Sequence, residues 1–339
     1  MSPAKTHRID LIEQLRGLAA LAVAWFHLTN GYVDWVVRTG SYGWLGVEVF
    51  FVISGVVIPL SLAADWQQRG TLALPQFLLR RIVRIEPPYL ISVLLVVALN
   101  LLAMRVPGFQ GKAQAYPPEQ ILLHAAYLIP LSSYGWLQPV YWTLAYEFAF
   151  YLTVALLIGA LASTRHWQIS GVMAVVLVLI GVRWVSPLLA LFIMGCVVFR
   201  SWAGLMSSRF AGLGLLACAA VMILMGAIEQ CVVGVLTAVA LLAQRQLAPL
   251  AARVSMLSGI GTISFSLYLL HVPIGGKIVN LGQRWLTSPL EHLLLSAAAL
   301  AGSLMAAYFF WRWVECPCIA ASRRMGYAWR HRPALPRRN

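Results

Sequence analysis

Residues 9–28 read IDLIEQLRGLAALAVAWFHL, an apolar run that contains one arginine, Arg16, and one histidine, His27. A helix of about 20 residues is long enough to cross the hydrocarbon of a bilayer. Comparable apolar runs recur along the chain as far as Val314, with no long polar block between them. This stretch and the similar apolar runs after it therefore predict an all-α fold, a polytopic transmembrane helix bundle.

The composition favours the same class. Of the 339 residues, 60% are hydrophobic and 11% are charged, whereas an ordinary soluble domain carries about a quarter charged residues. Such a chain cannot cover itself with polar surface in water, so lipid is expected to surround most of it. We expect about ten spans, each near the length that a membrane helix requires. The ten candidate spans are residues 10–28, 44–64, 85–104, 140–161, 168–185, 187–200, 211–227, 229–245, 258–278 and 292–314.

The basic residues predict an orientation. Most of the 25 lysines and arginines fall between spans on the side that carries the two chain ends, and basic segments mark the cytoplasmic side of membrane proteins. We expect both termini to be cytoplasmic, with residues 1–322 forming one transmembrane domain and 323–339 a basic, loosely ordered tail. The longest extramembrane segment, residues 105–139, is expected on the opposite side.

The net charge of +14 does not indicate nucleic acid. The basic residues form short clusters between apolar segments, a pattern suited to anionic lipid or to polyphosphorylated ligands at a membrane face. The five cysteines are odd in number and lack zinc-type spacing, so free thiols and no metal site are expected. Nothing in the sequence predicts the oligomeric state.

The first span carries the most informative polar pair. Arg16 and His27 are eleven residues apart, so they lie on one helix face about 16 Å apart along the axis. Polar groups at hydrocarbon depth are costly unless they are paired or hydrated, and they often mark substrate paths. Two structural alternatives stay open: Arg16 reaching the interface beside Asp10 or Glu13, and His27 bonded to a neighbour.

Three arginines form a second polar feature. Arg80, Arg81 and Arg84 make a basic ridge before Pro87-Pro88, and guanidinium groups match phosphate oxygens. Anchoring of the bundle to anionic lipid is the alternative interpretation.

Several further polar residues lie at or within spans. Glu48, Ser54 and Gly55 share the second span, where Gly55 favours close helix approach and Glu48 is alternatively a solvated end charge. Glu147 lies about one turn into the fourth span, at a depth where a carboxylate could orient His27; an ion pair with an arginine is the alternative. Arg312 and Glu315 are spaced for an ion pair.

Together these segments resemble the acyltransferase-3 family of integral membrane O-acyltransferases, which includes enzymes that acetylate O-antigen and other bacterial glycans. The resemblance covers nearly the whole chain, and its parts follow the family's order. They are Arg16-x10-His27, Phe50-Phe51-Val-Ile-Ser54-Gly55, Arg81-x-x-Arg84, Trp142-Thr143-Leu-x-x-Glu147, Tyr268-Leu-Leu-His271 and Glu315-x-Pro317. One departure is Glu48, where the family commonly has Asp; a second is that we expect no hydrolase-like domain of the kind that some relatives carry beyond the bundle.

The resemblance implies transfer of an acyl group, most often acetyl, from cytoplasmic acyl-CoA to a hydroxyl of a sugar or glycan. It implies a multi-pass protein of the bacterial inner membrane, with acetyl-CoA as co-substrate and no metal. We expect His27 as general base with Glu147 orienting it, and donor contacts from Arg16, Arg80, Arg81 and Arg84. Substrate contacts are expected from Glu48, Ser54, Trp142, Tyr268 and His271. A transporter or flippase, in which the same residues serve substrate passage, is the main alternative.

Overall fold

The computed structural model describes residues 3–105, 115–251 and 255–325, and this part of the chain consists of helices joined by turns and loops, with no strand. The predicted all-α class is confirmed. The expected tail at 323–339 falls, beyond Met325, outside the described residues. The helices are α1 (Pro3–Thr29), α2 (Val36–Gly40), α3 (Gly46–Arg69), α4 (Ala73–Ala103), α5 (Pro118–Ala125), α6 (Trp142–Leu161), α7 (His166–Gly181), α8 (Leu189–Trp202), α9 (Ser208–Leu224), α10 (Ile228–Leu242), α11 (Gln244–Ala251), α12 (Ser255–Thr262), α13 (Ser264–Leu270), α14 (Lys277–Gly282), α15 (Pro289–Phe310) and α16 (Cys316–Arg324).

Membrane-length helices are present. By length and composition, four helical stretches of the described chain could cross a bilayer, and a bent pair makes a fifth. The four are 10–29, 36–103, 142–161 and 289–324, and the bent pair is 256–262 with 264–282. Each of the ten predicted spans contains a helix, but four of these helices are shorter apolar ones: Trp167–Gly181, Leu189–Trp202, Ser208–Leu224 and Ile228–Leu242. The chain is a multi-pass membrane protein, and the number of ten spans stays a prediction.

The apolar stretch 36–103 is not one continuous helix. It contains α2, α3 and α4, and the chain turns between α3 and α4. Gly70 follows the last residue of α3 with φ +57°, a left-handed conformation that glycine adopts without steric cost. A helix 31 residues long, α4, follows the turn and includes the arginine ridge.

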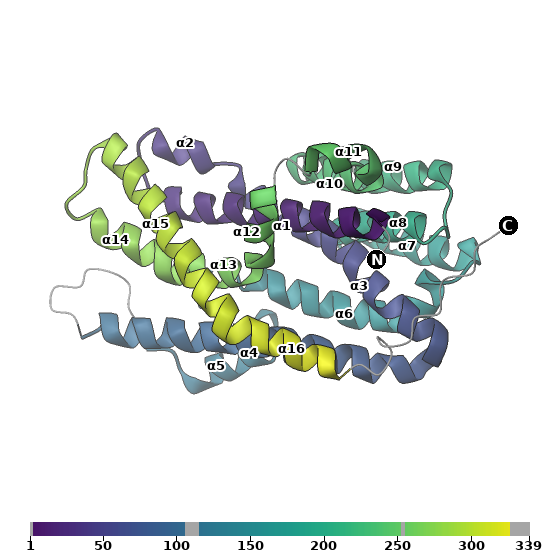
Figure 1. The fold of residues 1–339 in the computed structure, drawn as a ribbon, viewed down its shortest axis with the longest axis horizontal. Helices are drawn as coiled ribbons and strands as arrows, with labels where there is room; N and C mark the ends of the chain where they lie inside the picture. The colour runs from purple at the N-terminus through teal and green to yellow at the C-terminus, as the bar shows by residue number, and fades with distance from the viewer. Residues whose placement is uncertain (1–2, 106–114, 252–254, 326–339) are drawn as a thin grey trace.

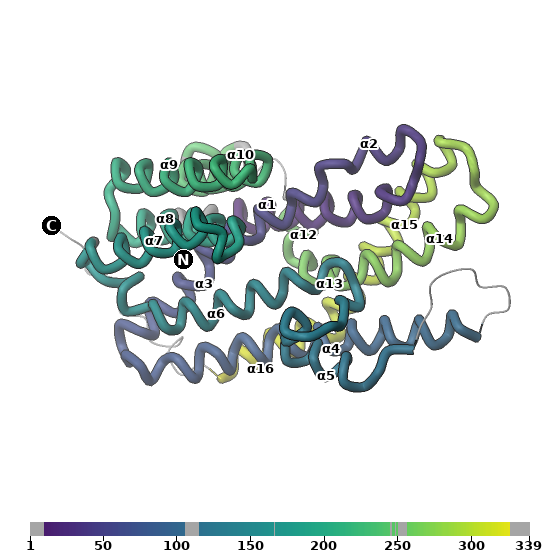
Figure 2. The backbone as a smooth tube through the Cα atoms, turned by 180° about the vertical axis from the view of Figure 1, so that it is seen from behind, coloured from purple at the N-terminus to yellow at the C-terminus, as the bar shows by residue number. Residues whose placement is uncertain are grey.

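The bundle is elongated, and most of its long helices follow the long axis, whereas α15 crosses it obliquely (Figures 1 and 2). One end, left in Figure 1, holds α2, α14 and the start of α15; α1 reaches this end with His27, so we call it the His27 end. The opposite half holds α7 to α10 beside the beginning of α1; Arg16 lies toward it, and we call it the Arg16 end. α5 packs on α4 and belongs to the segment between α4 and α6.

Two helix crossings are close enough to require glycine. A Cβ at Gly55 in α3 would lie 2.3 Å from the carbonyl oxygen of Phe192 in α8 and 2.8 Å from the Cα of Gly195. A Cβ at Gly261 would lie 1.9 Å from the carbonyl oxygen of Glu13 in α1. Backbones this close are typical of helix pairs that pack through small residues in membranes. The predicted packing role of Gly55 is confirmed.

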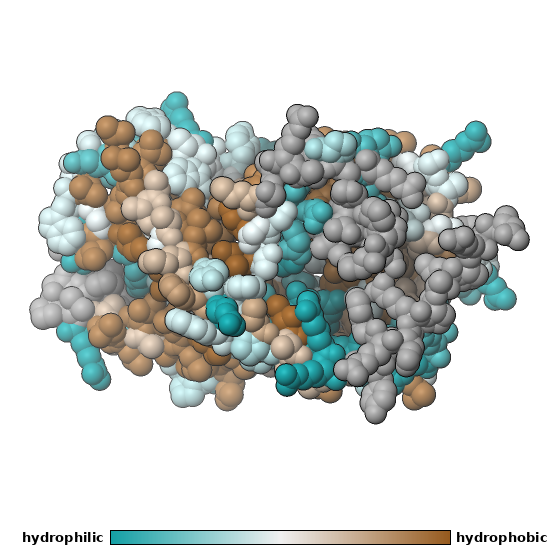
Figure 3. Space-filling view, viewed as in Figure 1, coloured by the Kyte–Doolittle hydropathy of each residue, from teal (hydrophilic) through white to brown (hydrophobic). Residues whose placement is uncertain are grey.

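The outer surface of the bundle is apolar where lipid would contact it. α15 and the segment after it expose large hydrophobic side chains, and Figure 3 shows hydrophobic residues over this part of the visible face. The exposed residues are Leu290, Leu294, Met305, Tyr308, Phe309 and Trp313. An apolar surface of this extent is stable in contact with acyl chains and not with water.

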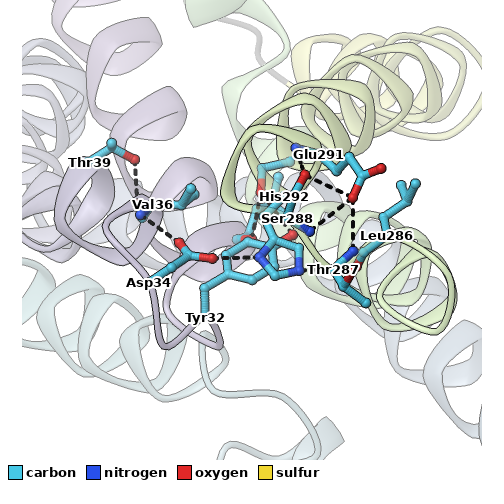
Figure 4. A network of polar contacts seen from close by, with 11 residues as sticks. Tyr32, Asp34, Val36, Thr39, Leu286, Thr287, Ser288, Glu291 and His292 are labelled. Carbon is cyan, nitrogen blue, oxygen red and sulfur yellow. Dashed lines mark hydrogen bonds and ion pairs between the residues drawn. The ribbon is translucent and has the colours of Figure 1, made fainter.

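A polar clasp joins the start of α15 to the loop after α1 (Figure 4). Its members are Tyr32, Asp34 and His292. The His292 Nδ1 atom lies 2.6 Å from Asp34 Oδ2, and its Nε2 lies 3.1 Å from the carbonyl oxygen of Leu286. The Tyr32 ring stacks on the imidazole at a centroid distance of 4.3 Å. The clasp therefore fixes the His27 end of α1 against α15.

The hydrogen bond from His292 lowers the pKa of the Asp34 carboxyl, and a bond from the backbone N–H of Val36 acts in the same direction. A capping box at Ser288 and Glu291 begins α15 next to the clasp. This arrangement satisfies the backbone N–H groups of Ser288 and Glu291.

Candidate active site

A cavity of about 320 Å³ lies inside the bundle. It is bounded by α1, α3, α4, α6 and α13, with residues from α16 and the segment before it. The polar residues that line it are Glu13, Arg16, Ser54, Arg81, Arg84, Thr143, Glu147, Tyr151, Ser264, Tyr268, Glu315 and Arg323. Polar side chains converging on one buried cavity are the usual mark of a binding or active site.

The cavity follows the helices only part of the way toward the His27 end. On α1 it is lined by Ile12, Glu13 and Arg16, and His27 is not among its lining residues. On α13 it includes Ser264 and Tyr268 but not His271, which is one turn further along the chain. The cavity thus ends near Tyr268, and His27 and His271 lie beyond it.

The arginines divide between the cavity and its surroundings. Arg81 and Arg84 line the cavity with Arg16, and the Nη2 of Arg81 donates to Ser61 Oγ at 2.6 Å. Arg80 points elsewhere, because its Nη1 forms an ion pair with Asp65 on α3 at 3.0 Å. The predicted ridge therefore contributes two of its three members to the cavity.

Two of these arginines have close neighbours. The guanidinium of Arg81 lies over the ring of Tyr151 at 5.5 Å. Arg16 pairs with Glu13 at 3.4 Å, which is one of the structural alternatives that the sequence left open; since both residues line the cavity, the pair does not remove Arg16 from the site. The four arginines of the lining, on α1, α4 and α16, outnumber its three carboxylates, Glu13, Glu147 and Glu315, so the cavity is suited to an anionic ligand.

Glu147 lines the cavity from α6. Tyr151, one turn further along α6, donates a hydrogen bond to its Oε1, and the Ser54 hydroxyl lies 3.5 Å from the same oxygen. Among the described residues Glu147 has no hydrogen bond with His27 and no ion pair with an arginine. The expected His27–Glu147 contact stays a prediction.

The two histidines lie against each other. The ring centroids of His27 and His271 are 5.3 Å apart, and the centroid of Tyr268 lies 5.9 Å from that of His271. His271 Nδ1 is 3.0 Å from the carbonyl oxygen of Leu267. A carbonyl oxygen can only accept a hydrogen bond, so Nδ1 must be the donor and carries the proton. The buried Nε2 has no partner in the structure and is therefore free to accept a hydrogen bond.

The other predicted substrate residues surround these groups. Glu48 is buried near the start of α3 with one carboxylate oxygen unpartnered. The Tyr268 hydroxyl lies 2.7 Å from Thr143 Oγ1 at the end of the cavity. Trp142 does not line the cavity; it packs edge-on against Phe51, which does, at 6.2 Å.

The contacts of Glu315 differ from the predicted ones. No ion pair with Arg312 occurs in the described chain, and the buried Glu315 accepts a hydrogen bond from Ser266 Oγ at 2.6 Å. The reason is local, because residues Trp311–Glu315 form a π-helix and the ordinary side-chain spacing of an α-helix does not apply there. A second π-helical segment begins at His271. Such segments are frequent at functional sites.

Sequence reasoning missed several lining residues. Tyr151 lies four residues after Glu147 on the same helix face, and this spacing could have indicated it. Thr143 is part of the motif that contains Glu147. Ser264 begins α13 where the chain bends by 63° after α12, and no local sequence signal marks its exposure to a cavity.

The comparisons with known proteins agree with this description. The acyltransferase-3 family model, described as an acyltransferase domain, matches residues 9–308, and the chain belongs to this family. Peptidoglycan O-acetyltransferase OatA from Listeria monocytogenes is 34% identical over 89 residues, which are 26% of this chain and 13% of that protein. Acyltransferase MdmB from Streptomyces mycarofaciens is 30% identical over 178 residues, or 49% of this chain and 44% of that protein.

The matched region thus spans less than half the length of either relative. No solved structure matches the chain significantly.

Proposed function

We propose that the protein is a membrane O-acyltransferase that moves an acyl group, acetyl in the first place, from acyl-CoA to a hydroxyl of a sugar or glycan. The observation that carries the proposal is the cavity that joins three arginines, Arg16, Arg81 and Arg84, to Glu147 and then to Tyr268. Membership of the acyltransferase-3 family supports the reaction class. The relative OatA, an O-acetyltransferase of peptidoglycan by its name, supports a glycan acceptor.

The donor would enter from the Arg16 end. With both termini in the cytoplasm of a bacterial cell and about ten spans in the inner membrane, this end faces the cytoplasm, where acyl-CoA is available. The phosphates of CoA would lie at Arg81, Arg84 and Arg323, since guanidinium groups bind phosphate oxygens in a two-bond geometry. The cavity of about 320 Å³ is large enough to hold an extended pantetheine arm with a short acyl group at its end.

The chemistry then requires a base near the acceptor hydroxyl. His27 takes the hydroxyl proton while the oxygen attacks the thioester carbonyl, the new carbon–oxygen bond forms, and the carbon–sulfur bond breaks. The proton on His27 passes to the leaving thiolate, so the enzyme returns to its starting state. The unpartnered Nε2 of His271 would accept a hydrogen bond from the acceptor.

Tyr268 lines the cavity, and its ring packs against His271, which packs against His27. For the thioester to reach His27, we expect Tyr268 and its neighbour Phe50, whose ring is 6.0 Å away, to change rotamer. Glu147 would orient His27 only after a similar rearrangement. Glu147→Gln tests this step, because a carboxylate that supports the imidazolium is worth more than its neutral isostere.

The test is acyl transfer by purified protein in proteoliposomes with radiolabelled acetyl-CoA and cell-envelope glycan as acceptor. Label is expected in the glycan fraction or, without acceptor, as slowly released acetate. A protein that moves intact acetyl-CoA or glycan across the vesicle membrane and leaves the thioester uncleaved would be a transporter, and the proposal would be wrong.

A further inference from the structure

One hydroxyl in the cavity is left without a partner. Ser264 is fully buried, with 0% of its surface exposed, and it lines the cavity. Its Oγ has no hydrogen-bond partner in the structure. A buried hydroxyl without a partner destabilises the fold, so alanine at this position would suit the apo protein better.

The neighbouring hydroxyls are all bonded. Thr143 bonds Tyr268, Ser266 donates to Glu315, and Tyr151 donates to Glu147. Serines inside helices commonly donate to a carbonyl one turn earlier. Ser264 has no such bond, because it is the first residue of α13 and the helix axis bends by 63° just before it. Ser264 therefore keeps an unpartnered hydroxyl in the wall of the cavity.

The position of Ser264 along the cavity indicates what it would bind. Tyr268, at the end of the cavity, is one helical turn further along α13, about 6 Å along the axis. Ser264 thus lies in the cavity lining about one helical turn from that end. In a pantetheine arm, a short ethylene link joins the sulfur to the nearest amide. If the thioester lies at Tyr268, this amide therefore lies near Ser264.

We propose that Ser264 is a donor-binding residue whose hydroxyl donates a hydrogen bond to the carbonyl oxygen of that amide. The inference rests on the proposed function, since it takes a pantetheine thioester as the donor. A neutral hydroxyl suits a neutral amide carbonyl, whereas the arginines of the cavity suit the phosphates. Ser264 contributes to recognition of the arm, and no proton transfer is assigned to it.

The experiment compares two variants and three donors. The variants are Ser264→Ala and, as a matched control, Ser303→Ala. Ser303 is equally buried, but its hydroxyl donates to the carbonyl of Ala299 at 2.7 Å and lies outside the cavity. The donors are acetyl-CoA, S-acetyl-N-acetylcysteamine, which keeps the amide, and S-butyl thioacetate, which lacks it.

For Ser264→Ala we expect kcat/KM to fall about three- to tenfold with the two amide-containing donors, the loss of one hydrogen bond, and to stay at the wild-type value with S-butyl thioacetate. Its Tm should equal or exceed that of the wild type. Ser303→Ala should leave the donor preference unchanged.

Equal losses with all three donors, or no loss with acetyl-CoA, would overturn the assignment. A wild-type protein that neither binds nor cleaves acetyl-CoA would overturn the proposed function first and this inference with it, and the two failures are therefore distinguishable.

Discussion

The clasp at the His27 end and the cavity differ in how fully their polar groups are paired. In the clasp, both nitrogens of His292 are bonded, and Asp34 accepts from His292 and from a backbone N–H. In the cavity and beside it, Ser264 Oγ, His271 Nε2 and one oxygen of Glu48 have no partner. Unpaired buried groups destabilise a fold, so they are expected where a ligand completes them. The comparison separates a region built for stability from a region built for binding.

The largest effect should come from His27, in the second region. His27→Ala is expected to reduce acyl transfer at least about a hundredfold, the usual contribution of a general base, while the protein still assembles in the membrane. Transfer of radiolabel from acetyl-CoA measures the rate. His27→Gln, which keeps size and polarity, should be equally inactive, and normal transfer by either variant would contradict the role.

Removal of an arginine that lines the cavity should weaken binding of the donor and have less effect on the chemical step. Arg81→Ala is expected to raise KM for acetyl-CoA about tenfold, because one charge-assisted phosphate contact is lost, with a smaller change in kcat. Arg80→Ala is the matched control, since Arg80 pairs with Asp65 outside the cavity. A larger KM effect from Arg80 than from Arg81 would show that the donor binds on another face of α4.

A substitution in the clasp should change the stability of the protein and not its binding of the donor. Asp34→Asn should lower Tm by a few degrees, because it replaces the charged acceptor of His292, and it should leave KM for the donor unchanged. Thermal unfolding in detergent, followed by fluorescence, measures the change. An Asp34 variant with wild-type Tm but altered donor KM would remove the distinction between the two regions.

The smallest effect concerns pH. The pKa of Asp34 is lowered in the folded state, mainly by the hydrogen bond from His292. A lowered pKa means that the folded state favours the carboxylate. The stabilisation is therefore fully present above the unfolded pKa of about 3.9 and is lost as the pH falls through the lower folded value. Tm of the wild type should fall toward that of Asp34→Asn in this range, and a constant difference would contradict the assignment.

The sequence predicted the fold class because hydropathy reports membrane-length helices directly. It also placed Gly55 correctly at a close helix crossing. It did not predict the bend before Ser264 or the π-helical segments at His271 and Trp311, since these depend on backbone hydrogen-bond register, which hydropathy does not record. The Arg312–Glu315 ion pair was wrong for this reason.

The site was predictable where it followed helix spacing. Arg16 and the arginine ridge were indicated by position on a helix, and Arg16, Arg81 and Arg84 line the cavity. Pairings across helices were not predictable: Arg80 binds Asp65, and Glu147 contacts Ser54. Such contacts depend on the rotation of one helix against another, which a single sequence does not specify.

The most direct test of the central claim is an experimental structure of the protein with a hydrolysis-resistant thioether analogue of acetyl-CoA. The account predicts the pantetheine arm inside the cavity, with phosphates at Arg81 and Arg84, the first amide at Ser264 and the sulfur near Tyr268. An analogue bound outside this cavity, or a cavity that stays empty at saturating concentration, would contradict it.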